Sequence, residues 1–329
     1  MTNDSTNHQV TYNCCNLTNS ALSPDYAGAV LMLTLSCIIV WSNSLIAVAI
    51  LSFRKLRGSN DYIFVLSLSV CDILVGLVYI PLEVVPDIVR PFPMICTLTR
   101  GTQVLLQTVN LLNVVIITLN KYIKIFHPFR YPFWVTKRTQ YVAVALIWNF
   151  PVVWATYATV RSLQLEDLST PKHCFQYKPP QEVTVSLIIT GFLLPAVILI
   201  ICNLRIALLV RKQHLRIASL QVSTSGRSPG SAPTTSQPLL TKKELRAVRL
   251  VTFIAITFLL FWCPVRIIFI VTSFCKDCIE RTYHITVYAI RLCHLNSAIN
   301  PLLYSLDRPL RIACKKLLKR QAGPLIVPE

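Results

Sequence analysis

Residues 63–82 read IFVLSLSVCDILVGLVYIPL, a mostly apolar run with one ionisable side chain, Asp72. About 20 residues of this kind form a helix long enough to cross the hydrocarbon core of a bilayer. The run lies within one of seven comparable stretches, at 28–53, 61–86, 97–126, 140–160, 183–210, 245–273 and 283–305. The sequence therefore predicts an all-α membrane protein, a bundle of seven transmembrane helices.

The composition of the whole chain agrees with a membrane protein. Of its 329 residues, 53% are hydrophobic and 14% are charged, and the mean hydropathy is +0.56. A soluble chain with a net charge of +18 would suggest a nucleic-acid partner, but here the charges are sparse and lie between the apolar runs. No nucleic-acid partner is expected. The cysteines are too dispersed for a small disulfide scaffold, and no pair of CxxC elements has zinc-site spacing.

The distribution of Lys and Arg predicts which ends of the spans face the cytoplasm. If the N-terminus is outside, the inner segments 54–60, 121–139, 205–249 and 306–329 hold 3, 5, 9 and 6 of these residues, 23 of the 32 in the chain. The positive-inside rule favours this orientation. We therefore expect a multi-pass protein of the plasma membrane, with 1–27 extracellular, 28–305 forming the transmembrane domain and 306–329 cytoplasmic. The glycosylation sequons at Asn3 and Asn16 agree with an outer N-terminus.

Two of the inner segments have a composition that predicts their behaviour. Residues 223–238 are rich in Ser, Thr, Pro and Gly, so we expect a flexible loop over about 212–241. Residues 307–320 alternate basic and apolar side chains at helical spacing, which predicts a short amphipathic eighth helix on the anionic inner leaflet. Cys314 on this helix suits palmitoylation, and a plain buried or free thiol is an equal alternative.

Polar side chains inside the spans are candidates for a functional site, because they are costly to place in a membrane. Asp72 is the clearest, and five others could face it: Asn43, Asn110, Asn296, Ser297 and Asn300. Such a cluster either joins helices through hydrogen bonds or provides the oxygen ligands of a water and sodium site. Both interpretations stay open at this stage.

The sequence does not favour a transporter, a channel or an enzyme. An inverted-repeat transporter would show an internal repeat, and a channel would show a polar line through the spans; beyond the Asp72 cluster neither is found. Asp72 has no second carboxylate inside a span to form an aspartyl dyad, and the chain has no HExxH or GxSxG motif. We therefore expect no catalytic residue and no cofactor other than a structural sodium ion.

Eight motifs, in order along the spans, resemble those of the rhodopsin-like (class A) G-protein-coupled receptors. They are Asn43, Leu68-Ser69-Val70-Cys71-Asp72, Cys96, Asn120-Lys121-Tyr122, Trp148, Pro195, Phe258-Leu259-Leu260-Phe261-Trp262-Cys263-Pro264 and Asn300-Pro301-Leu302-Leu303-Tyr304. Any one motif is weak, but together they cover essentially the whole chain. The resemblance implies a receptor that binds a small extracellular ligand and activates heterotrimeric G proteins, with arrestin and the lipid bilayer as further partners.

The resemblance also implies roles for single residues. Cys96 would form a disulfide with Cys174 in the second outer loop. Phe258 and Trp262 match the aromatic pair beneath the ligand pocket, and span six would swing about Pro264. Asn300, Pro301 and Tyr304 match the end of span seven that rearranges on activation. The family's sodium pocket is matched by Asp72, Asn110, Asn296, Ser297 and Asn300, although Asn110 stands where the family usually has Ser.

Two departures from the family pattern affect activation. The family's Asp-Arg-Tyr reads Asn120-Lys121-Tyr122, so an ammonium replaces a planar guanidinium. Lys121 could pair with Glu244 at the start of span six, and the neutral Asn120 predicts raised basal signalling. Asn203 also stands where the family usually has the Tyr that meets Tyr304 in the active state, which predicts altered coupling.

The residues at the predicted pocket do not favour a simple amine ligand. Span three offers Gln103 and Gln107 and no carboxylate, and Gln103 falls where aminergic receptors of the family carry an Asp. Arg266 lies one turn outward of Trp262, and an unpaired guanidinium in a span is costly.

Arg266 has two predicted roles. It either pairs with an acid such as Glu83 or Asp87, or it binds an anionic, acceptor-rich ligand with help from Gln103, Gln107 and His294. Arg291 is a further candidate ligand contact. His294 is as well explained by a neutral hydrogen-bonding histidine of the core.

A narrower resemblance points to the adenosine receptors. Residues 274–278 (FCKDC) and 288–297 (YAIRLCHLNS) are similar to the CxxC of their third outer loop and the His of their span seven, and a Cys275–Cys278 disulfide would close the loop. Phe269 stands where those receptors carry the Asn that binds adenine. In those receptors a Glu follows the Phe of the second outer loop, but no Glu follows Phe175 in this sequence. A nucleoside receptor is therefore the alternative, and chemosensory and internal signalling roles both stay open.

Overall fold

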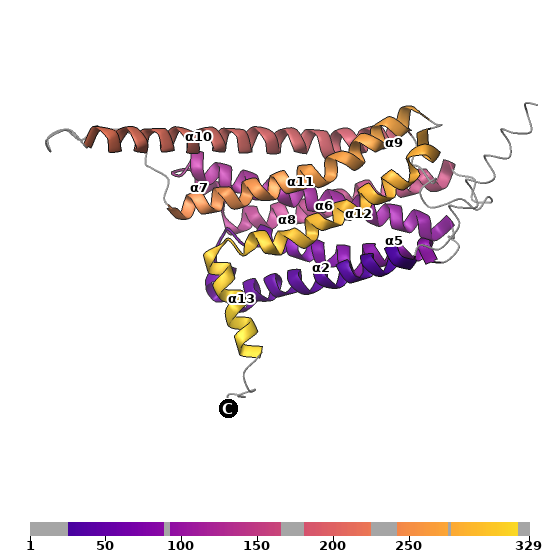
Figure 1. The fold of residues 1–329 in the computed structure, drawn as a ribbon, viewed down its shortest axis with the longest axis horizontal. Helices are drawn as coiled ribbons and strands as arrows, with labels where there is room; N and C mark the ends of the chain where they lie inside the picture. Colours follow the sequence, from indigo (N-terminus) through magenta and orange to yellow (C-terminus); the bar gives the residue numbers. More distant parts are fainter. Residues whose placement is uncertain (1–25, 89–92, 166–180, 225–241, 276–277, 322–329) are drawn as a thin grey trace, which may run out of the picture.

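The computed structural model describes residues 26–88, 93–165, 181–224, 242–275 and 278–321, and their long segments are all helical. Seven long helical segments lie side by side (Figure 1). They are α2 (Tyr26–Ser52), α4 with η1 and α5 (Ile63–Leu74, Val75–Tyr79 and Ile80–Ile88), α6 (Pro93–Phe126), α8 (Lys137–Leu165), α9 with η3 and α10 (Gln181–Ile188, Ile189–Leu193 and Leu194–Thr224), α11 (Lys242–Phe274) and α12 (Cys278–Tyr304). The described residues also form three shorter helices: α3 (Arg54–Arg57), α7 (Tyr131–Trp134) and α13 (Arg308–Gln321).

Hydropathy alone identifies six of these segments as membrane spans. In the described ranges, six helices are long and apolar enough to cross a bilayer, and α12 is not among them. Yet α12 has 27 residues, the same length as α2. Its hydropathy is lower because it carries Arg291, Asn296 and Asn300. The predicted all-helical bundle is confirmed, and its seventh helix is the one whose polar side chains build the centre of the protein.

The core of the bundle is organised around α6, which packs against α4, α8, α10 and α11. Polar side chains such as Asn43, Asp72, Asn113 and Asn300 are fully buried, whereas Trp41 is 64% exposed and Val153 is 70% exposed. This distribution, polar inside and apolar outside, is expected where lipid rather than water surrounds the helices.

The π-helical turn η1, which is wider than an α-helical turn, allows a close contact between the first two spans. A Cβ atom at Gly76 would come within 2.6 Å of Val40 Cγ2 and 3.1 Å of the Ser36 carbonyl oxygen. The Ser36 hydroxyl donates a 2.6 Å hydrogen bond to the Gly76 carbonyl. The wide turn and the glycine together let η1 approach α2 without a side chain between them.

The end of the bundle formed by α3, α7 and α13 is here called the inner end, because its Lys and Arg content predicts that it faces the cytoplasm. Helix α13 leaves the end of α12 and turns away from the direction of the spans (Figure 1). Its Leu310 and Ala313 are buried, whereas the basic side chains of Arg311, Lys315 and Lys316 are exposed. The predicted short eighth helix is therefore present and amphipathic.

Candidate functional site

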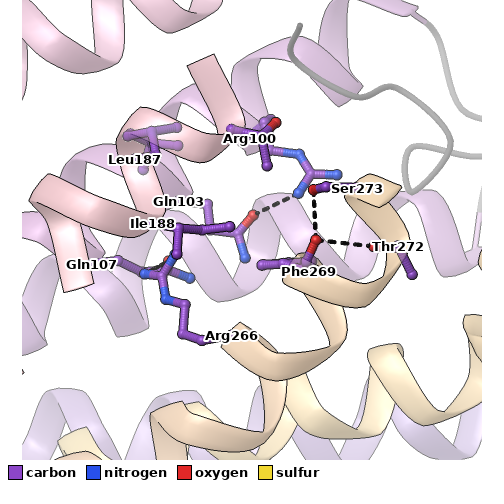
Figure 2. Close-up of a pocket in the computed structure, with 11 residues that line it drawn as sticks. Arg100, Gln103, Gln107, Leu187, Ile188, Arg266, Phe269, Thr272 and Ser273 are labelled. Atoms are coloured by element: carbon purple, nitrogen blue, oxygen red, sulfur yellow. Dashed lines mark hydrogen bonds between the residues drawn. The ribbon is translucent and has the colours of Figure 1, made fainter. Parts of the chain in front are cut away.

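A cavity lies between α6, α9 and α11, toward the end of the bundle opposite the inner end. Its volume is about 70 Å³, well below the roughly 300–1,000 Å³ of pockets that enclose drug-sized ligands, so it has room only for a ligand of a few heavy atoms. Polar side chains from α6 face residues of α11 across it (Figure 2). The lining residues are Arg100, Gln103, Val104 and Gln107 from α6, Thr184, Leu187 and Ile188 from α9, and Arg266, Phe269, Thr272 and Ser273 from α11. The predicted contacts Gln103, Gln107, Arg266 and Phe269 are therefore brought together.

Arg266 is the most constrained side chain of the cavity. Its guanidinium carbon lies 5.5 Å from the ring centroids of both Phe192 and Trp262. One terminal nitrogen donates a 3.1 Å hydrogen bond to Gln107 Oε1, while the buried Nε has no hydrogen-bond partner. Within the described chain no carboxylate forms an ion pair with it. A buried charged donor without a partner is costly, so the site is poised for an acceptor.

A second guanidinium, that of Arg100, lines the same cavity and was missed from the sequence. It lies 6.0 Å from the Phe269 ring centroid, and a terminal nitrogen is 3.5 Å from Gln103 Oε1. Gln103 Nε2 is buried without a hydrogen-bond partner. The spacing of 100, 103 and 107 places all three side chains on one face of a helix. That spacing is the signal that could have identified Arg100.

His294 is bound to Glu83 rather than facing the cavity. The distance from His294 Nε2 to Glu83 Oε2 is 2.7 Å, and the Tyr79 ring lies 5.2 Å from the imidazole. In the described part of the chain Glu83 pairs with His294, and Arg266 bonds to Gln107 rather than to Glu83. Arg291 is not among the residues that line the described cavity, and Phe175 and the Asp87 side chain lie outside the described residues.

A second polar site occupies the middle of the bundle around Asp72. Asp72 Oδ1 accepts hydrogen bonds from Asn110 Nδ2 at 2.8 Å and Ser297 Oγ at 2.6 Å, and Oδ2 accepts one from Asn300 Nδ2 at 2.9 Å. Asn296 Nδ2 donates to Asn110 Oδ1 at 3.3 Å. Asn43, the fifth residue expected to face Asp72, instead donates from Nδ2 to the Ser297 carbonyl at 3.0 Å. The other four form the cluster with Asp72, and it joins α4, α6 and α12.

This cluster contains oxygen atoms that suit a small hard cation. Asn296 Oδ1 and Asn300 Oδ1 are buried and have no hydrogen-bond partner. Together with the Asp72 carboxylate they form the kind of all-oxygen donor set that hard cations prefer. A bound sodium ion would neutralise the carboxylate, and these residues would hold it. No group of three or more His, Cys, Asp or Glu side chains in the described residues suggests a transition-metal site.

The aromatic pair expected beneath the pocket is stacked. The rings of Phe258 and Trp262 are 5.7 Å apart with an interplanar angle of 27°, and both side chains are buried. Pro264 and Pro301 lie inside α11 and α12, where each removes a backbone hydrogen bond. The hydroxyl of Tyr304 is buried without a hydrogen-bond partner. It could gain a partner if α12 rearranges.

At the inner end, Lys121 and Lys124 share one carboxylate. Lys121 Nζ lies 2.6 Å from Asp61 Oδ1, and Lys124 Nζ lies 2.8 Å from Asp61 Oδ2. Burial raises the pKa of Asp61, but the charges and hydrogen bonds of the two lysines outweigh it and lower the pKa to about 2. The sequence did not predict Asp61 as a partner. The expected partner, Glu244, has a side chain outside the described residues.

The neighbours of Lys121 have partners of their own. Asn120 Oδ1 accepts a hydrogen bond of 3.1 Å from the hydroxyl of Tyr131 on α7, and Tyr122 stacks on Phe126 with ring centroids 4.5 Å apart. The motif at the end of α6 is therefore tied to α7 through Asn120 and to the start of α4 through Lys121.

The comparison with known proteins decides the family. Residues 42–304 match the family described as 7 transmembrane receptor (rhodopsin family). This chain belongs to that family. The receptor is 25% identical to the D(1A) dopamine receptor of Didelphis virginiana over 84% of its own chain and 69% of the relative. It is 25% identical to the D(1B) dopamine receptor of Homo sapiens (90% and 71%) and 26% identical to the D(1) dopamine receptor of Carassius auratus (84% and 83%).

Family membership makes this a multi-pass membrane receptor rather than an enzyme. It implies an extracellular ligand and coupling to a heterotrimeric G protein. The relatives named above are dopamine receptors, and the narrower resemblance to adenosine receptors stays a prediction.

The predicted covalent features of the receptor are described in part. Cys96 and Cys275 are each disulfide-bonded, but Cys174 and the side chain of Cys278 lie outside the described residues, as do Asn3 and Asn16. Cys314 is a free, partly buried thiol on α13, and burial raises its pKa. Its palmitoylation stays a prediction.

Proposed function

We propose that this receptor responds to a small anionic ligand bound in the cavity between α6, α9 and α11. The observation that carries the proposal is Arg266: among the described residues its guanidinium has only the neutral Gln107 as an acceptor, and its Nε has none. A carboxylate or phosphate would supply charged acceptors in the geometry that a guanidinium binds best. The apolar side chains of Leu187, Ile188 and Phe269 would surround the remainder of a compact ligand.

The same cavity is unsuited to a simple amine. Of the described residues that line it, two carry a guanidinium group and none carries a carboxylate. An ammonium group would meet like charges, and burying an ammonium without a counter-ion is costly. The relatives are named for dopamine, but at 25% identity the ligand does not follow from the name. Gln103, in the position where an acid is expected in aminergic receptors, argues that the ligand class has changed.

Ligand binding at Arg266 has a direct route to the activation residues. The guanidinium contacts the Trp262 ring, which stacks on Phe258, one turn before Trp262 in α11 and nearer the inner end. An anion that draws the guanidinium away from Trp262 would change the packing of this pair near Pro264. We propose that the resulting movement of α11 opens the inner end to a heterotrimeric G protein, and afterwards to arrestin.

The decisive experiment measures G-protein activation in cells that express the receptor at the surface, across carboxylates, phosphates, amines, amino acids and nucleosides. We expect an anion to activate the wild type and Arg266→Gln to reduce its potency roughly tenfold to a hundredfold, because a charge-assisted hydrogen bond contributes about 1.5–3 kcal/mol. Arg161→Gln is the matched control. Arg161 is an arginine on α8 that does not line the cavity and lies 3.6 Å from Glu182. Activation by an amine that Arg266→Gln leaves unchanged would refute the proposal.

A nucleoside receptor is the second candidate function. The observation that favours it is the buried His294 held by Glu83, in the part of α12 that is similar to adenosine receptors. Against it, Phe269 lines the cavity where those receptors carry an Asn. Activation by nucleosides in the same panel would support this candidate. A chemosensory role predicts transcripts in sensory epithelium, and broad expression across tissues would argue against it.

A further inference from the structure

A group of aromatic and basic side chains covers the outside of the inner end next to α7. The exposed fractions are 86% for Phe129, 80% for Phe133 and 47% for Trp134. The cations Arg130, Lys137 and Arg138 lie among them and are also exposed. This group is here called the α7 surface: Phe129, Arg130, Phe133, Trp134, Lys137 and Arg138. None of these side chains belongs to the ligand cavity, the Asp72 cluster or the Lys121 site.

The charge of the α7 surface is uncompensated. The sequence contains no acidic residue between Asp87 and Glu166. In the part of the chain that the structure describes, no carboxylate forms an ion pair with Arg130, Lys137 or Arg138. Large exposed aromatic rings together with unpaired cations are unusual on a surface that faces only water.

The arrangement of the surface is fixed by local contacts. The Arg130 guanidinium carbon lies 5.7 Å from the centroid of the Trp134 ring, and the His127 ring lies 5.7 Å from the same ring. Thr136 and Thr139 exchange hydrogen bonds between backbone N–H and side-chain oxygen, at 2.9 and 3.2 Å, which fixes the first turn of α8. The aromatic and basic groups are therefore presented together rather than on independent segments.

The α7 surface continues the lipid-facing side of α8. Side chains exposed along α8 follow helical spacing, with Val142 52%, Leu146 63%, Phe150 52% and Val153 70% exposed. Arg138 lies four residues, about one turn, before Val142 on the same side of the helix. Since Val142 and Val153 face the membrane, the residues one turn toward the inner end lie at the level of the lipid headgroups.

We propose that the α7 surface binds an anionic phospholipid of the cytoplasmic leaflet. Lys137 and Arg138 contact the headgroup phosphate and carboxylate, and the Phe133 and Trp134 rings lie at the boundary with the acyl chains, where aromatic residues are enriched. A lipid fits better than a protein partner, because the surface runs directly into the apolar side of α8. The proposal requires the inner end to face the cytoplasm, where anionic lipids are concentrated.

The test measures binding of phosphatidylserine and phosphatidylcholine to the purified full-length receptor in detergent by native mass spectrometry. We expect the wild type to prefer phosphatidylserine. In the double variant Lys137→Gln/Arg138→Gln the affinity for phosphatidylserine should fall roughly thirtyfold at low salt, because each basic residue near an anionic surface contributes about 1 kcal/mol, a fivefold change in affinity. Phe133→Ser should also weaken binding, since the ring is exposed and supports no part of the core.

Two controls separate this site from general charge effects. Arg211→Gln/Lys212→Gln removes the same charge from exposed positions on α10, in a stretch without aromatic residues, and should leave binding unchanged. Lys137→Arg/Arg138→Lys keeps the charge and should keep the binding. The proposal would be overturned if the Lys137→Arg/Arg138→Lys variant lost as much phosphatidylserine affinity as the glutamine variant. It would also be overturned if the wild type bound the two lipids with equal affinity. Unchanged lipid affinity with reduced G-protein activation in the glutamine variant would show instead that the surface contacts the G protein.

Discussion

At the scale of single residues, the most informative contact is the carboxylate that two lysines share. Asp61 precedes α4, and Lys121 and Lys124 lie near the end of α6, so the two ion pairs tie these segments together at the inner end. The family pattern predicts that the cation at position 121 is restrained by an acid on span six. In this receptor a carboxylate of the first inner loop holds it.

Replacing Asp61 tests whether this contact restrains the resting receptor. In Asp61→Asn the ammonium of Lys121 loses its charged partner and becomes free to reorient, so we expect higher G-protein activation without ligand. The measurement is basal activity at matched surface expression. Lys124→Gln is the control, because it removes only the more exposed of the two pairs and should change basal activity little. Basal activity of Asp61→Asn at or below that of wild type would contradict this role.

The pKa of Asp61 limits how pH acts on this contact. A carboxyl whose pKa is lowered to about 2 contributes stability above its unfolded value of 3.8 and loses that contribution as the pH falls toward 2. Asp61 therefore remains ionised from pH 5 to 8. The raised basal signalling expected from the neutral Asn120 stays a prediction, and Asp61 provides an acid near Lys121 that the motif itself lacks.

Some site residues could be predicted from the sequence, and others depend on packing. Asp72 and its partners were predictable, because a carboxylate inside an apolar run must find polar neighbours in other spans. The partners of Glu83, Arg266 and Lys121 were not predictable. Each could reach more than one group of opposite charge, and only the rotation of the helices selects among them. Arg100 was missed because it lies just outside the most apolar part of its span.

At the scale of elements, two spans contain a π-helical turn, η1 in the second span and η3 in the fifth. Hydropathy does not predict such turns. The apolar runs indicated the spans at 61–86 and 183–210, but nothing in their periodicity indicated η1 or η3. Gly76 lies in η1 and Gly191 lies in η3. The two glycines have different surroundings, which makes them a matched pair for a test of stability.

We expect Gly76→Ala to destabilise the receptor and Gly191→Ala to leave it unchanged. The added Cβ at Gly76 would meet Val40 Cγ2 at 2.6 Å and the Ser36 carbonyl at 3.1 Å, whereas nothing lies within 4 Å of a Cβ at Gly191. Overpacking of this kind costs about 1–3 kcal/mol. The Tm of the purified receptor measures the difference. Equal Tm values for the two variants would show that α2 and η1 can separate without cost.

At the scale of the whole molecule, the Asp72 cluster lies between the ligand cavity and the inner end. It connects α4, α6 and α12 through hydrogen bonds to one carboxylate. The cavity is lined by α6, α9 and α11, and the Lys121 site also begins on α6. A rearrangement that carries a signal along the bundle must therefore either preserve this cluster or break it.

A cation bound at Asp72 would hold the three helices in the resting arrangement. We expect the Tm of the purified wild-type receptor to be higher in sodium chloride than in choline chloride of equal concentration, and the difference to vanish in Asp72→Asn. Asn203→Ala is the control: Asn203 is a polar residue of α10 whose amide, among the described residues, bonds to the Leu199 carbonyl of its own helix, and the salt difference should persist in it. If the wild type has the same Tm in both salts, the cluster joins helices through hydrogen bonds alone and holds no sodium. The unpartnered oxygens of Asn296 and Asn300 argue for the cation, because a purely structural cluster would leave these buried acceptors unsatisfied at a cost of about 1–3 kcal/mol each.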